Sequence, residues 1–195
     1  MKFLIGISLM IFGALAMISC AGHRPYINEE ADFGFYKRVG VMPFSNFSND
    51  NNATGKVTSS FVTELLLTNS LEVANMGDFE KITRAILKDS KSDLLGQLTS
   101  EEAISIGREA KVEGIFVGAV KDYGMVRSGQ EEFPLVSLII RLFDCQTGKI
   151  VWSYEITRKG GPKFPIFSFG ETHTIGEMTA KVCRETALAF SKATK

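Results

Sequence analysis

The stretch from Pro134 to Gly160, PLVSLIIRLFDCQTGKIVWSYEITRKG, predicts a long β-hairpin and with it the fold class. Its first arm is apolar on both faces around Leu138–Ile140, which indicates a central strand that is covered on both sides. The residues QTGK at 146–149 form the turn between the arms. One face of the alternating second arm carries Ile150, Trp152, Tyr154 and Ile156. We therefore expect a hairpin at about 135–159.

Before the hairpin, strand-like and helix-like segments alternate along the chain. A compact apolar strand at 39–44 is followed by a polar cluster and then by a helix, because apolar residues at 57–66 recur every three to four positions. A short strand at 71–76 leads into a second amphipathic helix. Asp78 is the expected N-cap of that helix.

The remaining segments complete the order of elements. Thr99 and Glu102 stand in capping-box relation at the start of a third helix. A buried strand dotted with glycine follows at 112–126. The polar, glycine-containing residues YGMVRSGQEEFP at 123–134 are expected to form a loop before the hairpin. The last helix begins after Gly170 and runs nearly to the end of the sequence.

This order, β-α-β-α-α-β-β-β-α, predicts an α/β fold. We expect a single domain at 37–195, with a mixed, partly antiparallel sheet flanked by helices and a C-terminal helix. A chain of this length is enough for one domain with a real core and hardly enough for two.

The composition and the motifs exclude several classes of function. Basic and acidic residues balance at 22 each, so net charge attracts no nucleic acid. No C-x-x-C, H-E-x-x-H or phosphate-cradling glycine loop is present, and we expect no metal and no cofactor. His173 is the one histidine that could serve catalysis, but no G-x-S-x-G turn accompanies it, so we expect no enzyme. A disulfide between Cys145 and Cys183 is left open.

The N-terminus resembles the signal of bacterial lipoproteins. Residues 1–19 contain an uncharged apolar run that is shorter than the roughly 20 residues of an ordinary membrane-spanning helix. The residues MISC at 17–20 resemble a lipobox, in which the cysteine is lipidated and becomes the mature N-terminus. Cys20 is therefore the predicted lipidation site, and Ala21 fits the pattern that permits transport to the outer membrane. The alternative is a plain secretory signal or an uncleaved anchor helix.

Residues 20–36 are expected to be a lipid-anchored tether between Cys20 and the domain. They show no clear periodicity. Fully extended, a tether of this length spans at most about 50 Å, and a relaxed coil spans far less. The domain is therefore expected to stay near the membrane.

One loop-like segment, GPKFPIFSFGETHT at 161–174, is unusually apolar. Loops are normally polar, and aromatic side chains are typical anchors of protein interfaces. Contact with the core, with a partner or with the membrane all remain open for this segment. The candidate partner interface consists of Phe164, Ile166, Phe167 and Phe169.

Four segments carry a family resemblance: RVGVMPFSNFSND at 38–50, the stretch 57–87, AKVEGIFVGAVKDYG at 110–124, and LIIRLFDCQTGKIVWSYEI at 138–156. In this order they resemble the CsgG-like bacterial outer-membrane lipoproteins, which include the curli secretion channel and lipoprotein activators of penicillin-binding proteins. The most specific part is Arg141–Ser153, with an arginine-led strand, a Thr-Gly turn and a strand that ends near Trp-Ser. The resemblance implies a mixed α/β sheet and a role in binding and assembly, with no catalytic residues.

We accordingly expect an outer-membrane-anchored periplasmic lipoprotein that serves as a binding module in envelope assembly or export. Its partners are the outer membrane, through lipid on Cys20, and other envelope proteins, and a homo-oligomer is left open. The insertions that form membrane strands in the curli channel are short here, so the sequence favours a binding module over a pore. The alternatives are a ring-forming secretion channel component of the curli type, a regulator of a peptidoglycan synthase, and an envelope hydrolase that uses His173.

Overall fold

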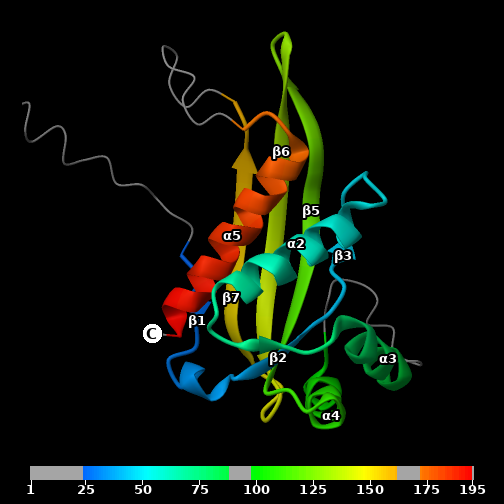
Figure 1. Cartoon of the computed structure of the whole chain (residues 1–195), viewed down its shortest axis with the longest axis vertical. Helices are drawn as coiled ribbons and strands as arrows, with labels where there is room; N and C mark the ends of the chain where they lie inside the picture. The colour runs from blue at the N-terminus through cyan, green and yellow to red at the C-terminus, as the bar shows by residue number, and fades with distance from the viewer. Residues whose placement is uncertain (1–23, 88–97, 162–171, 195) are drawn as a thin grey trace, which may run out of the picture.

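A mixed sheet of seven strands forms the centre of the computed structural model, which describes residues 24–87, 98–161 and 172–194 (Figure 1). The strands lie in the order β1-β7-β6-β5-β2-β4, and β3 also pairs with β5. Pairs among β1, β7, β6 and β5 are antiparallel, while β2 and β3 run parallel to β5. The strands are β1 (Tyr26–Ile27), β2 (Arg38–Val41), β3 (Ser45–Asn46), β4 (Glu72–Val73), β5 (Gly114–Ser128), β6 (Glu131–Asp144) and β7 (Ile150–Lys159). The predicted α/β class with a mixed sheet is confirmed.

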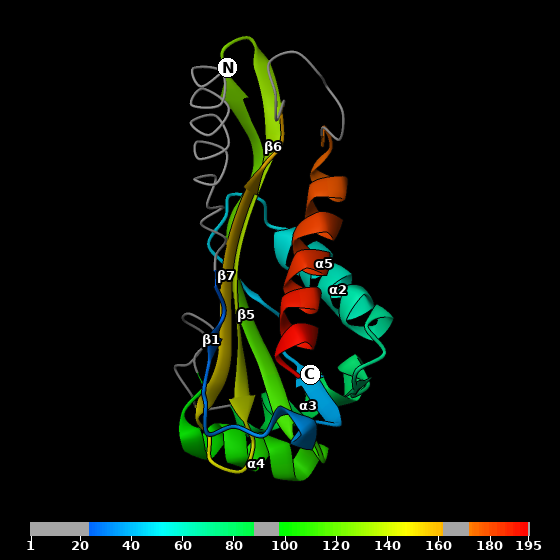
Figure 2. The same cartoon turned by 90° about the vertical axis from the view of Figure 1, so that its left-hand side faces the viewer.

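Helices pack on both faces of this sheet. Figure 2 shows α2 and α5 side by side over one face, while α3 and α4 lie together at one end of the molecule. Consecutive residues of β5 confirm the two sides, because Phe116 packs under α2 and α5 whereas Ile115 packs with α3 and α4. The helices are α2 (Ala53–Leu67), α3 (Met76–Ile86), α4 (Ser100–Ala110) and α5 (Ile175–Ala193), with a short 3-10 turn η1 (Phe33–Phe35).

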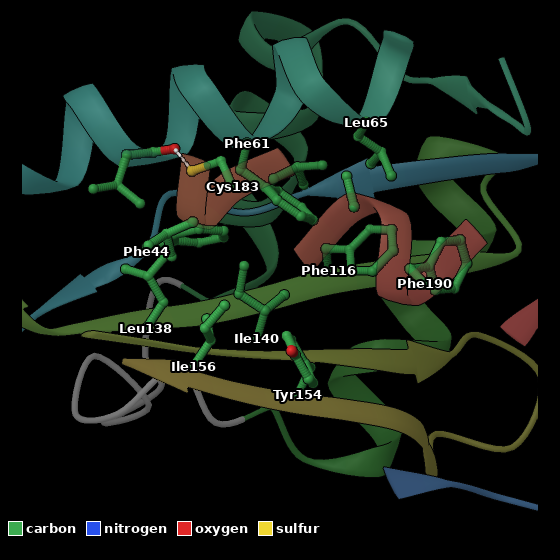
Figure 3. Close-up of a cluster of buried hydrophobic side chains, with 14 of the residues drawn as sticks. Phe44, Phe61, Leu65, Phe116, Leu138, Ile140, Tyr154, Ile156, Cys183 and Phe190 are labelled. Atoms are coloured by element: carbon green, nitrogen blue, oxygen red, sulfur yellow. Dashed lines mark hydrogen bonds between the residues drawn. The ribbon is translucent and has the colours of Figure 1, made fainter. Parts of the chain in front are cut away.

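The larger hydrophobic cluster, here called the main core, lies between the sheet and the pair α2 and α5 (Figure 3). Phe116 is its centre, with ring centroids 5.0 Å from Phe190, 5.4 Å from Phe61 and 6.2 Å from Trp152. These rings meet edge to face, the arrangement that aromatic quadrupoles favour. The predicted central strand β6 contributes Leu138 and Ile140 to this core.

The smaller cluster lies on the other face, under α3 and α4. It contains Phe79, Ile106, Ile115 and Val117, all buried. Its packing requires two glycines, because a Cβ on Gly40 would lie 2.2 Å from the Phe79 ring and one on Gly107 would lie 2.3 Å from the Cβ of Cys145. We call this group the small cluster.

The turn of the predicted hairpin is built by one carboxylate. Asp144 accepts hydrogen bonds from the backbone N–H of Thr147 at 2.9 Å and from its hydroxyl at 2.6 Å. Gly148 takes the left-handed conformation, with φ +69°, and a Cβ there would lie 2.4 Å from the Cα of Ser100. The turn therefore needs glycine both for its shape and for its contact with the start of α4.

Helix starts agree with the sequence in one case and differ in another. The capping box of Thr99 and Glu102 is present at the start of α4, as predicted. Asp78 is not the N-cap of α3, because the side chain of Asn75 accepts a hydrogen bond from the Asp78 backbone N–H at 3.2 Å. Asp78 lies instead in the first turn, where its charge favours the positive helix end.

The residues predicted to form a polar loop at 123–134 are mostly strand. β5 continues to Ser128 and β6 begins at Glu131, and the two strands stay paired up to a turn at Gly129. The prediction failed because the polar side chains suit the exposed positions of a paired ribbon, in which Tyr123 and Phe133 are buried. We call residues 121–135 the ribbon, and it projects beyond α5 (Figures 1 and 2).

The described part of the predicted tether, 24–36, is docked on the domain. β1 pairs with β7, and the backbone N–H of Asn28 donates to the Val151 carbonyl at 2.8 Å. Phe33 and Tyr36 are buried in the main core. The prediction of a tether is wrong for these residues, because pairing with β7 and burial of Phe33 and Tyr36 together hold them on the domain.

Candidate functional site

The residues predicted to carry function lie mostly outside the described ranges. Cys20 and the candidate interface at Phe164, Ile166, Phe167 and Phe169 belong to this group, and they stay predictions. His173 is described, and it is exposed immediately before Thr174, the N-cap of α5.

The described residues bring no metal-binding set together. Within 24–87, 98–161 and 172–194, no group of three His, Cys, Asp or Glu side chains is placed to hold a metal ion. His173 is exposed, and its side chain lines neither of the two pockets that are described below.

A polar pocket of about 320 Å³ lies beside the β6–β7 turn and between it and the segment after β1. Asp144 lines it, but this carboxylate already accepts two hydrogen bonds from Thr147. Burial and the neighbouring Asp144 raise the pKa of the Tyr36 phenol, which therefore stays neutral. Asp144 thus stabilises the turn, and a neutral Tyr36 phenol lines the pocket beside it.

The two described cysteines are free and buried. Cys183 lies in the main core and Cys145 in the small cluster, so the sheet separates them and the disulfide left open by the sequence does not form. Burial raises the pKa of each thiol to about 12. Neither thiol has the lowered pKa of a reactive cysteine.

An apolar groove lies where β1 meets α5. It has a volume of about 420 Å³, and we call it the edge groove. Ile27 lies opposite Trp152 in the β1–β7 pair, so its side chain points to the face that α5 covers. Ile27 is 41% exposed and Leu188 of α5 is 47% exposed. The groove is lined by Pro25, Ile27, Tyr154, Glu185, Leu188, Ala189, Lys192 and Ala193.

One ion pair connects the strand and the helix that form the groove. Arg158 of β7 approaches Glu185 of α5 at 2.7 Å, with both side chains about one-third exposed. Burial raises the pKa of the nearby Tyr154 phenol, and the charge of Arg158 opposes this shift. The pair fixes α5 against β7 and compensates the one carboxylate that lines the groove, which leaves an apolar surface.

The ribbon is a second exposed surface. Met125 is 46% exposed near its end, and charged side chains, among them Arg127, Glu131 and Glu132, are exposed around the turn. Its two strands pair with each other from Asp122 and Ser137 to the turn. A ribbon with charged side chains on both faces resists aggregation, so this surface suits a polar contact better than a hydrophobic one.

Sequence reasoning missed the edge groove, although two signals for it are present. Tyr26 and Ile27 are adjacent apolar residues inside the stretch that was interpreted as a tether. Leu188 is a large apolar residue outside the buried stripe of the C-terminal helix. Neither signal is strong alone, because single exposed apolar residues are common.

No helix in the described part of the chain is long and apolar enough to cross a membrane. The sequence matches no known family model, and no curated protein is significantly similar to it.

Several solved structures are similar to this one. A PelC dodecamer from Paraburkholderia phytofirmans aligns with a TM-score of 0.58 at 15% identity, covering 86% of this chain and 96% of that one. Lipoprotein GNA1162 from Neisseria meningitidis aligns with a TM-score of 0.52 at 17% identity, covering 78% and 99%. The hypothetical protein CT253 from Chlamydia trachomatis aligns at 0.52 with 12% identity, covering 82% and 98%. At these identities the likeness establishes a shared fold, which at least one lipoprotein also has.

Proposed function

We propose that this protein is an outer-membrane lipoprotein whose periplasmic domain binds other envelope proteins or copies of itself. Residues 1–19 are the signal peptide, and Cys20 carries the lipid that anchors the chain. No enzymatic activity belongs to this proposal. The protein acts as a binding module in envelope assembly or export.

The observation that carries the proposal is the docking of β1 so soon after Cys20. Only the residues between Cys20 and Tyr26 can separate the lipid from β1, a stretch that spans at most about 20 Å. This distance is far shorter than the tether expected from the sequence. The domain is therefore held against the inner face of the membrane, where it can meet only partners that come to the membrane.

The anchor is tested with Cys20→Ala in cells that receive labelled fatty acid. The unchanged protein is expected to take up the label and to fractionate with the outer membrane, while the variant does neither. Cys145→Ala is the matched control, because its buried thiol is no acceptor for lipid and the variant keeps the label. Labelling of Cys20→Ala would contradict the proposal.

A ring-forming secretion component is the second candidate function. The similarity in fold to a protein that forms a dodecamer supports it, as does the resemblance to the curli channel in sequence. Size measurement and cross-linking of the lipidated protein test this candidate. A strictly monomeric protein would reject it.

Cross-linking from the predicted interface can identify the partner. Photo-cross-linking from Phe167 or Phe169 in cells is expected to capture an envelope protein or a second copy, since aromatic residues are typical interface anchors. Cross-linking from Met125 on the ribbon serves as the comparison. Capture of a peptidoglycan synthase would favour the regulator over an assembly role, and turnover that is lost in His173→Ala would favour the hydrolase.

A further inference from the structure

The sheet edge at β1 exposes apolar side chains on both of its faces. Tyr26 lies opposite Ser153 and Ile27 opposite Trp152, so the two side chains point to opposite faces. Tyr26 is 55% exposed, and Ile27 with Leu188 lies in the edge groove on the α5 side. A surface or molecule that covers this edge therefore contacts apolar side chains on both faces of β1.

This edge is also where the chain arrives from the predicted lipid. Tyr26 lies six residues after Cys20, so the two are separated by at most about 20 Å. That distance is shorter than the roughly 30 Å thickness of a bilayer's hydrocarbon core. Of the described elements, β1 is the first that follows Cys20, and it must lie close to the lipid head groups.

The side chains at this edge suit a lipid interface. Tyrosine is enriched at membrane–water boundaries because its ring is apolar and its hydroxyl is polar. Arg24 is exposed two residues before β1, and Lys192 lines the edge groove, so two cations lie near the apolar groups of this edge. Cations near an anionic leaflet add attraction to the contact made by apolar side chains.

We propose that the β1–α5 edge rests on the phospholipid surface, with Tyr26, Ile27 and Leu188 among the head groups. The proposal rests on the lipid anchor of the proposed function. A single acyl anchor leaves a domain free to tumble, whereas this second contact fixes its orientation. The strands then lie roughly parallel to the membrane, and β4, at the opposite end of the strand order, faces the periplasm.

The test compares two tryptophan variants of the full, lipidated protein in vesicles of phosphatidylethanolamine and phosphatidylglycerol with brominated acyl chains. Leu188→Trp places a reporter in the edge groove. Phe47→Trp is the matched control, because Phe47 is 48% exposed against 47% for Leu188 and follows β3 at the opposite side of the sheet. The one native tryptophan, Trp152, is fully buried and gives both variants the same background.

The bromolipid is expected to remove most of the added emission of Leu188→Trp and little of that of Phe47→Trp. Equal quenching of the two variants, or none in either, overturns the orientation. If position 188 is not quenched and cross-links to a second copy of the protein, the edge is a protein interface and the proposal is wrong. Flotation with labelled fatty acid separates the two failures. A protein that floats with its label but is unquenched at the edge overturns this inference alone, whereas one that does not float overturns the anchor as well.

Discussion

The main core and the small cluster lie on opposite faces of one sheet and are built differently. The main core closes around interlocking rings, with Phe116 fully buried among Phe61, Trp152 and Phe190. The small cluster has only two buried rings, Phe79 and Phe143, and depends on close contacts at Gly40 and Gly107. The main core obtains more of its stability from buried apolar area than the small cluster does.

The two helix pairs that cover these clusters differ in the same way. α2 and α5 pack against each other, and Arg184 of α5 also pairs with the nearly buried Glu64 of α2 at 3.2 Å. α3 and α4 are shorter and cover only one end of the sheet (Figure 1). We therefore expect the α3–α4 end to open first, at a free energy below that of global unfolding.

The largest difference is expected between two Phe→Ala variants. Phe116→Ala leaves a cavity among rigid rings and should lower the free energy of unfolding by about 4–5 kcal/mol. Phe79→Ala should lower it by about 3 kcal/mol, because α3 can settle into the vacated space. Urea unfolding of both variants measures this. Equal losses would show that the small cluster is packed as rigidly as the main core.

A smaller loss of stability is expected when a methyl group is added where α4 contacts the residue after β6. In Gly107→Ala the new Cβ meets the Cβ of Cys145, which cannot move without its backbone, so we expect a loss of about 1–3 kcal/mol. Gly176→Ala in α5 is the control, since a Cβ there meets nothing within 4 Å. It should be neutral or stabilising by up to about 1 kcal/mol. A stable Gly107→Ala protein would disprove the close contact.

Removing one cap should loosen the small cluster selectively. Thr99→Ala deletes the side-chain acceptor of the capping box of α4 and should cost about 1 kcal/mol. Hydrogen exchange should accelerate in α4 and remain slow in α5. Thr99→Ser keeps the hydroxyl and should behave like the unchanged protein. If α5 exchanged faster as well, the two ends would unfold as one unit.

A separate effect on stability is expected from the thiols at high pH. The folded protein keeps both thiols protonated to about pH 12, whereas the unfolded chain releases these protons near the ordinary pKa of 9.0. The stability that they contribute is fully present below about pH 9 and is lost as pH rises toward 12. Urea midpoints across this range should fall less in a variant with both Cys145 and Cys183 changed to alanine. The buried Tyr36 and Tyr154 phenols act in the same direction and remain in that variant.

Thiol labelling at pH 8 gives a further distinction between the two clusters. Neither thiol should react at the rate of an exposed cysteine, because both are buried and protonated. Cys145 should react before Cys183, since it lies in the cluster that is expected to open first. If Cys183 reacted before Cys145, the main core and not the small cluster would be the part that opens first.

Much of the fold follows from patterns that are local in the sequence. The alternation through Trp152 and Tyr154 predicted the buried face of β7, and the residues around Thr147 and Gly148 predicted the turn. Thr99 and Glu102 placed the start of α4. These elements were predictable because their signals depend only on neighbouring residues.

The failures share one cause, which is contact over long sequence distance. The segment 24–36 lacks any periodicity. It nevertheless pairs with β7, which lies more than a hundred residues later in the sequence, and it buries Phe33 in the main core. The polar residues around Gly129 looked like a loop, but pairing of β5 with β6 makes them strands. Of the candidate site, the sequence offered Cys20 and the Phe167 segment as predictions and gave no reason to connect Ile27 with Leu188.

By itself, then, the sequence determined the class of fold, the central hairpin, and an N-terminal pattern that predicts a lipid anchor, because each depends on the order and spacing of adjacent residues. Only the tertiary structure decided that the expected tether is an edge strand, that the cysteines lie on opposite faces of the sheet, and that Ile27 and Leu188 share one groove. These facts depend on which distant segments pair. Hydrogen bonds and burial across the sheet select that pairing, and no local pattern records it.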